Sequence, residues 1–216
     1  MDFISLAQPT LTADYSVLMA IVDFLPVLFY FLAAWLVTKD LYPHVGKTTY
    51  ALLSAGCYMV FIGGAFKALW KLLFCFGINY PVLFTSFFPM QGPGFCLYFA
   101  GLIMAFKGIK KDGAALNAVT ATTMIASTPL LALQSIGSIG SLVALAVMGF
   151  KRKSAIAGIY FILSLIFLLG MVGLSIAIDS SLGWANWLEQ GVNTVGQVFF
   201  FLGALKMHKV GYKAGA

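Results

Sequence analysis

Six polar side chains interrupt the long apolar runs of this sequence: Asp23, Lys67, Gln91, Gln190, Asn193 and Gln197. Such groups are costly inside a membrane and usually face the interior of a helix bundle or a water-filled cavity. Asp23 lies about two helical turns into the first run, and Lys67 lies near the end of the second. An Asp23–Lys67 ion pair would neutralise both charges, and the carboxylate could instead carry a proton or bind an amine. We therefore predict that the six residues form a substrate-binding site.

The amide side chains could supply hydrogen bonds in that site. Residues 190, 193 and 197 follow the i, i+3, i+7 spacing of one helix face and form a polar stripe. Gln91 lies in the segment Pro89–Gly94, where two prolines remove backbone donors and two glycines loosen the helix. Membranes tolerate such a break where it is buried in protein or lines a cavity. The pattern favours an outward-opening cavity between two halves of a bundle; the alternative is hydrogen bonding that only holds helices together.

Catalytic and metal-binding patterns are missing. The sequence has no HExxH, GxSxG or P-loop motif. The two histidines, His44 and His208, lie near the ends of apolar runs, and the spacing of Cys57, Cys75 and Cys96 does not match a metal site. We expect no enzyme activity, no catalytic residue, no bound metal and no cofactor.

The composition requires a membrane. Hydrophobic residues make up 61% of the chain and charged residues 9%, against about 25% charged residues in soluble domains. Long apolar runs without alternation indicate helices rather than a barrel. The net charge of +6 comes from short basic clusters at helix ends, which orient a membrane protein, so no nucleic-acid partner is expected. The N-terminal region lacks the basic start of a signal peptide, so the first run is expected to be retained with its N-terminus outside.

The apolar runs predict an all-α, polytopic helical bundle with seven transmembrane helices, forming a single domain over residues 1–216. The seven predicted spans are about Val17–Val37, Thr48–Leu72, Val82–Phe106, Ala115–Leu133, Ser135–Phe150, Ala155–Ile178 and Trp184–Leu205. With the N-terminus outside and the C-terminus cytoplasmic, eleven of the 13 Lys and Arg residues would face the cytoplasm, with Lys67 and Lys71 as exceptions.

The uncharged segment Ala114–Phe150 decides this count. It is long for one crossing, which takes about 20 residues, and short for two. Basic residues flank it on both sides, and both flanks most simply lie in the cytoplasm, so the chain would cross twice. The predicted join at Gln134–Gly140 is tight, and a re-entrant hairpin is an open alternative.

Two local matches suggest an internal repeat. Ala55–Tyr58 resembles Ala157–Tyr160, and Phe99–Gly101 resembles Phe201–Gly203, both at an offset of 102 residues. This favours a parallel three-plus-one-plus-three arrangement, as found among transporters. The units would cover about 15–107 and 135–209, with a linker helix at about 114–133. Chance similarity is one alternative, and a nearly ungapped alignment that gives six spans in inverted units is another.

In outline, seven spans in this arrangement resemble the sugar facilitators of the PQ-loop type and the microbial rhodopsins. However, spans one and five contain no Pro-Gln pair, and the middle of span seven lacks the lysine that would bind retinal. The resemblance therefore concerns architecture, which does not imply function.

The leading hypothesis is a carrier or facilitator for a small polar solute in a bacterial-type plasma membrane. The expected partners are the lipid bilayer and that solute. The alternatives are a narrow channel and a non-transporting seven-helix sensor or partner-binding subunit, whose basic inner surface could dock an acidic protein. A protein partner or a homo-oligomer is left open, as is the identity of the solute.

Overall fold

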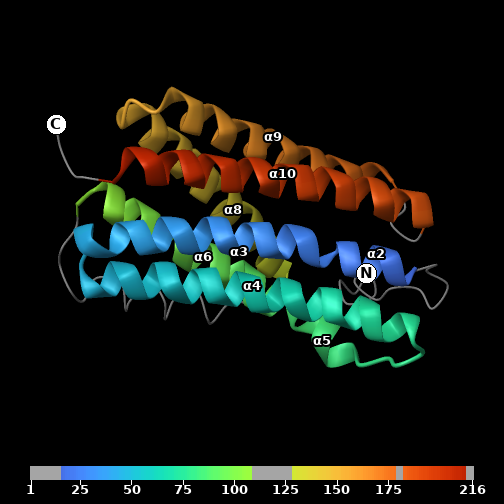
Figure 1. Ribbon diagram of the computed structural model, residues 1–216. Helices are drawn as coiled ribbons and strands as arrows, with labels where there is room; N and C mark the ends of the chain where they lie inside the picture. The colour runs from blue at the N-terminus through green and yellow to red at the C-terminus, as the bar shows by residue number, and fades with distance from the viewer. Residues whose placement is uncertain (1–15, 109–127, 179–181, 213–216) are drawn as a thin grey trace.

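The computed structural model describes residues 16–108, 128–178 and 182–212, and these residues form helices and no strands (Figure 1). The helices are α2 (Val17–Val22), α3 (Phe24–Leu41), the 3-10 helix η1 (Tyr42–His44), α4 (Lys47–Cys75), α5 (Pro81–Thr85), α6 (Phe87–Phe106), α8 (Thr128–Lys151), α9 (Ala155–Ala177) and α10 (Gly183–Val210). The predicted all-α class is confirmed.

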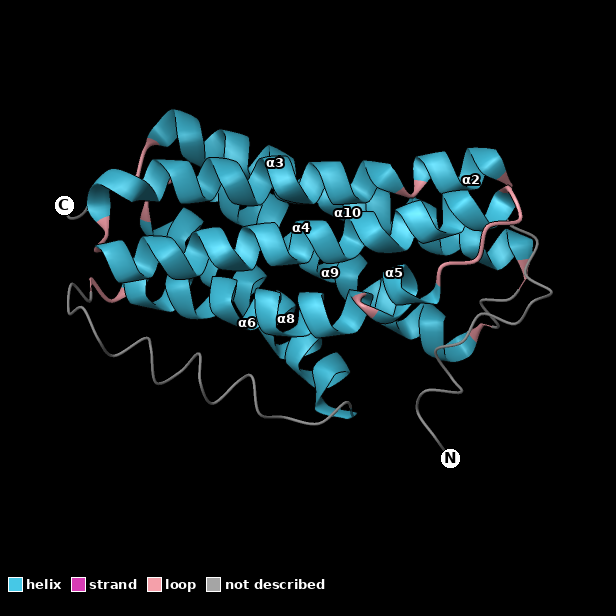
Figure 2. Ribbon diagram, turned by 90° about the horizontal axis from the view of Figure 1, so that it is seen from below, coloured by secondary structure: helices cyan, strands magenta, loops and turns pink. Residues whose placement is uncertain are grey.

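Five helical segments are long and apolar enough to cross a membrane: Val17–His44, Lys47–Cys75, Pro81–Phe106, Leu130–Lys151 and Ala155–Leu174. The sixth long segment, α10, has 28 residues but carries the polar stripe predicted above. It packs along α3 and α9. The described chain is thus a bundle of apolar helices with one more polar member; α3, α4 and α10 lie along a common long axis, and the start of α8 is inclined away from it (Figure 2).

The six long segments form a closed ring. α3 packs on α4, α4 on α6, α6 on α8, α8 on α9, α9 on α10, and α10 on α3. Two pairs of adjacent segments are parallel. In the first, His208 contacts Asp40 and Gln190 contacts Val22, so α10 and α3 run in the same direction.

In the second parallel pair, α6 and α8, Leu130 lies against Gly92 and the Lys151 ammonium lies 4.5 Å from the centre of the Phe106 ring. Along the chain, α3, α4 and α6 therefore have the same alternation of direction as α8, α9 and α10. The contacts within the first group of three also have counterparts within the second.

The prediction of a chain reversal at Gln134–Gly140 is wrong, because α8 is helical throughout this segment. Its glycines serve close packing rather than a turn. A Cβ on Gly137 would lie 2.6 Å from the Phe95 carbonyl carbon, and one on Gly140 would lie 2.7 Å from the Phe99 ring. Most of the predicted linker helix at 114–133 falls outside the described residues, and the count of seven helices is not confirmed.

Two helix breaks precede prolines by three residues. The hydrogen-bond pattern of the first segment is interrupted at Asp23, between α2 and α3, and that of the third at Ser86, between α5 and α6, although both residues keep right-handed helical dihedral angles. A proline lacks the N–H that would bond the carbonyl four residues earlier. Pro26 therefore leaves the Val22 carbonyl without its helical donor, and Pro89 does the same to Thr85. The two breaks lie in the same half of the bundle, beside the cavity described below.

One end of the bundle, which we call the basic end, carries most of the described cations: Lys39, Lys47, Lys107, Lys151, Arg152, Lys153, Lys206 and Lys209. The half next to it is tightly packed. Leu53, Leu102, Leu145 and Met207 are fully buried there, and the Tyr98 hydroxyl donates to the Ala34 carbonyl at 3.1 Å. We call the opposite end, which holds Lys67 and Lys71, the cavity end.

Candidate functional site

A partly open cavity of about 190 Å³ lies inside the ring, in the half next to the cavity end. Asp23, Lys67, Gln91, Gln190, Asn193 and Gln197 all line it, so the structure brings the six predicted site residues together. Each helix contributes side chains one turn apart along its inward face. The polar lining is completed by Tyr30, Lys71, Gln134, Ser138, Asn186 and Glu189.

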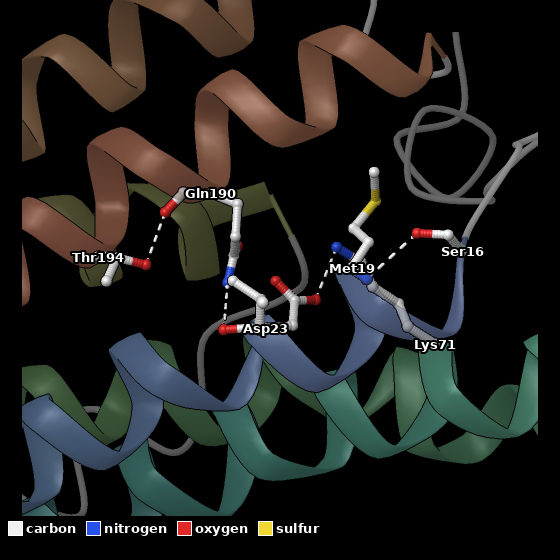
Figure 3. Close-up of polar contacts among 7 residues, drawn as sticks. Ser16, Met19, Asp23, Lys71, Gln190 and Thr194 are labelled. Atoms are coloured by element: carbon white, nitrogen blue, oxygen red, sulfur yellow. Dashed lines mark hydrogen bonds and ion pairs between the residues drawn. The ribbon is translucent and has the colours of Figure 1, made fainter.

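Asp23 forms an ion pair in the part of this cavity nearest the cavity end. Its carboxylate lies 2.7 Å from the ammonium of Lys71, and the two side chains are only 12% and 10% exposed (Figure 3). The predicted partner was Lys67, and this prediction is wrong. Lys67 and Lys71 are four residues apart and share one face of α4, so spacing alone did not separate them. The Lys67 ammonium lies instead 4.4 Å from the centre of the Phe87 ring.

Gln190 supplies the hydrogen-bond donor that the Val22 carbonyl lacks at the first helix break. Its side-chain amide donates to the Val22 carbonyl at 3.1 Å, the carbonyl that Pro26 deprives of its helical donor. Figure 3 shows Gln190 reaching from α10 toward the segment that carries Asp23. Gln190 thus both lines the cavity and joins α10 to the break beside it.

Two glutamines cross the cavity at a deeper level. The Gln91 amide donates to the Val60 carbonyl of α4 at 3.3 Å, and the Gln134 amide donates to the Gln91 side-chain oxygen at 3.1 Å. Together they join α4, α6 and α8. Gln134 was missed by the sequence analysis because its segment was assigned to a turn, which would have placed it at the surface.

Tyr30 and Phe95 line the deeper part of the cavity, with their ring centres 5.4 Å apart. Below them is a smaller cavity of about 40 Å³ that shares the lining residues Asn193 and Gln197 with the larger one. The Tyr30 hydroxyl is buried and has no hydrogen-bond partner among the described residues. Further toward the basic end the packed half of the bundle begins.

Three more polar residues line the cavity one helical turn away from residues already described, two of them on α10 and one on α8. Asn186 and Glu189 lie one turn before Gln190 and Asn193, and Ser138 lies one turn after Gln134. The spacing of Asn186 and Glu189 could have identified them, since they continue the same face. Lys71 could have been found in the same way from Lys67.

The site combines charged groups near the cavity end with amides and hydroxyls deeper in the bundle. Its volume of about 190 Å³ is large enough for several water molecules or for one small polar molecule. Within the described residues, no group of three or more His, Cys, Asp or Glu side chains could hold a metal ion. The arrangement is suited to holding a small polar molecule by hydrogen bonds and charge.

A separate contact joins α3 and α10 at the basic end. His208 Nδ1 lies 2.9 Å from both carboxylate oxygens of Asp40. Tyr212 follows α10 and is buried beneath this end. Burial raises the pKa of its hydroxyl well above the ordinary value, and the nearby Asp40 carboxylate raises it further. These residues do not line the cavity.

Comparison of the chain with protein-family models, with curated proteins and with solved structures finds no match.

Proposed function

We propose that this protein is a membrane carrier or facilitator for a small polar solute. The observation that carries the proposal is the convergence of polar side chains on one cavity inside a ring of apolar helices. Polar groups within membrane segments usually face a substrate pathway or a wet cavity. The matched donors and acceptors in this cavity could replace the water that a polar solute loses on entering.

The one-sided position of the cavity supports a carrier over an open channel. The cavity lies next to one end of the bundle, and buried apolar side chains fill the interior of the other half, where a groove of about 170 Å³ lies between α3 and α4. If the basic end faces the cytoplasm, as the positive-inside rule predicts, the cavity is on the outer side. Transport would then require the packed half to open while the cavity end closes.

The two helix breaks provide places where such a movement could occur. Transporters often bind substrates at discontinuous helices near the middle of the membrane. Here the breaks at Asp23 and Ser86 both lie beside the cavity. Rotation of α2 and α5 about these points would change access without unpacking α3 and α6.

We also propose that the two halves are parallel repeats. The offset of 102 residues between the sequence matches is supported by the matching directions of the two helical groups and by their corresponding helix neighbours. The cavity would then lie between the two repeats.

Uptake into proteoliposomes tests the proposal. A panel of labelled sugars, amino acids, polyols and vitamins would be offered to the reconstituted protein and to two variants of α10. Asn193→Phe places an aromatic ring in the cavity. Val195→Phe places the same ring at a position whose native side chain is 40% exposed. We expect flux of one solute class that Asn193→Phe reduces at least tenfold and Val195→Phe leaves intact.

Uniformly absent flux from correctly folded protein would count against transport. It would favour the alternative, a non-transporting sensor or partner-binding subunit whose basic end contacts an acidic partner. Single-channel recording would identify a channel.

A further inference from the structure

The charged groups of the cavity balance one another. Lys67 and Lys71 provide two positive charges, and Asp23 and Glu189 provide two negative charges. A ligand with net charge would leave an uncompensated charge in a poorly solvated site, which is costly. A neutral molecule or a zwitterion would preserve the balance. Of these two kinds of ligand, only a zwitterion could form ion pairs with both a lysine and a carboxylate of the cavity.

The two lysines are not equivalent toward such a ligand. Lys71 already forms a 2.7 Å ion pair with Asp23, so another carboxylate would have to compete with it. The Lys67 ammonium is held by the face of the Phe87 ring at 4.4 Å. An approaching carboxylate can join Lys67 without breaking that contact, because the ring occupies one side of the ammonium.

The deeper part of the cavity is polar but uncharged. Gln91 and Gln134 are joined by a hydrogen bond, and two buried oxygens nearby have no partner among the described residues: the Tyr30 hydroxyl and Gln134 Oε1. Tyr30 is only 6% exposed. Buried polar atoms in folded proteins are nearly always hydrogen-bonded. A ligand hydroxyl or amide could donate to Gln134 Oε1 and accept from the Tyr30 O–H, which would satisfy both groups.

We propose that the solute is a small zwitterionic amino acid with a hydroxyl or amide side chain, an inference that rests on the proposed solute cavity. Its carboxylate meets Lys67, its ammonium lies toward Glu189, and its side chain reaches Gln134 and Tyr30. The cavity, with a volume of about 190 Å³, has room for a molecule the size of serine.

A matched ligand series tests this proposal on the purified full-length protein. Serine is compared with glycerate, which lacks the amine, with serinol, which lacks the carboxylate, and with glycerol, which lacks both. Alanine keeps the zwitterion and lacks the side-chain hydroxyl. Binding is measured by isothermal titration calorimetry in detergent, independently of transport. We expect serine to bind at least tenfold more tightly than glycerate, serinol or glycerol, and about fivefold more tightly than alanine.

Two variants locate the ends of the ligand. Lys67→Met removes the ammonium but keeps an unbranched side chain, and should weaken serine and alanine binding equally, by tenfold or more. Tyr30→Phe removes one hydroxyl, and should weaken serine binding severalfold while leaving alanine binding unchanged. A merely structural role for Tyr30 would affect both ligands alike. Size-exclusion chromatography checks that each variant remains folded.

The outcomes separate this inference from the proposed function. Equal or tighter binding of glycerate, serinol or glycerol would overturn the amino-acid assignment, as would absent binding of all five compounds. If another solute is transported in the uptake panel, the carrier proposal would survive that result. Serine binding without flux would instead support the ligand class and contradict the carrier.

Discussion

Asp23 lies where the first membrane segment loses a helical hydrogen bond, because Pro26 has no N–H for the Val22 carbonyl. The residue separates α2 from α3, and its carboxylate holds Lys71 of α4 at 2.7 Å. On the other side, Gln190 of α10 bonds the Val22 carbonyl. Two neighbouring helices thus stabilise one break through side chains. This explains how a broken helix persists in an apolar bundle, where free backbone groups are expensive.

The Asp23–Lys71 pair is expected to behave as a coupled unit. Either Asp23→Asn or Lys71→Met alone leaves a mostly buried charge without its main partner, so each should destabilise the protein by about 3 kcal/mol. The double variant should recover part of this loss, with a coupling free energy of about 1–3 kcal/mol. Thermal unfolding of the four proteins in detergent measures the cycle. Strictly additive effects would show that the pair contributes nothing specific.

Gln190 should matter for stability only while Pro26 is present. Gln190→Leu leaves the Val22 carbonyl without a donor, at a cost of about 1–3 kcal/mol. Pro26→Ala restores a backbone N–H four residues after that carbonyl. The same Gln190→Leu change should therefore cost much less in the Pro26→Ala background. Unfolding curves of the single and double variants test this, and an equal cost in both backgrounds would refute the explanation.

At the scale of whole helices, glycine determines how closely the segments approach. α4 and α6 pack backbone to backbone at Gly56, where an added Cβ would lie 2.5 Å from the Tyr98 amide nitrogen and 2.6 Å from the Gly94 carbonyl oxygen. α8 uses Gly137 in the same way against α6. Small residues allow van der Waals contact between helices in lipid, where the hydrophobic effect does not drive association.

Gly56→Ala should therefore be strongly destabilising for such a small change. Neither contacting atom belongs to a flexible side chain, so the helices must separate, at a cost of about 1–3 kcal/mol. The matched control is Gly191→Ala in α10, where an added Cβ meets nothing within 4 Å, and we expect a change within about 0.5 kcal/mol. Melting temperatures in detergent compare the two; equal effects would contradict the packing argument.

The continuity of α8 can be tested at Ile136, a side chain that is 61% exposed on the outside of the bundle. In a helix that crosses the membrane this side chain faces lipid, and a cysteine there should resist a water-soluble maleimide. Vesicles opened to both sides would be labelled after replacement of the three native cysteines by alanine. Tyr80→Cys, at a position that is 59% exposed between α4 and α5, is the positive control. Rapid labelling of Ile136→Cys would show that position 136 is in contact with water, which would favour the predicted turn over a continuous helix.

For the whole molecule, the distribution of charge gives the ring two different ends. The cavity end carries Lys67 and Lys71, and Asp23 compensates Lys71. The basic end collects the remaining described cations, and the parallel directions of α6 and α8 bring Lys107 and Lys151 together there. A membrane protein with this asymmetry is expected to keep its basic end in the cytoplasm.

This orientation predicts a simple labelling pattern. In intact cells an impermeant maleimide should modify Tyr80→Cys at the cavity end. Lys209→Cys, an exposed position at the basic end, should react only after the cells are permeabilised. Both variants use the background without native cysteines. The reverse pattern would place the cavity on the cytoplasmic side.

The sequence alone was sufficient for the helical class and for six of the residues that line the cavity. Polar groups such as Asp23 and Asn193 are conspicuous in apolar runs, because the membrane makes each of them costly. The choice of Lys71 over Lys67 as the partner of Asp23 could not be predicted. Both lysines share a helix face, and the distance between α3 and α4 decides which one reaches the carboxylate.

The segment around Gln134 is a second feature that could not be decided from the sequence. Its serines and glycines are typical of a turn, yet they lie in a continuous helix packed against α6. Glycine permits both a turn and a close helix contact, and only the neighbouring helix distinguishes them. Composition and periodicity thus determined that the chain forms apolar helices with polar interior faces. The tertiary structure decided which faces meet, because close packing and ion pairing depend on residues far apart in the chain.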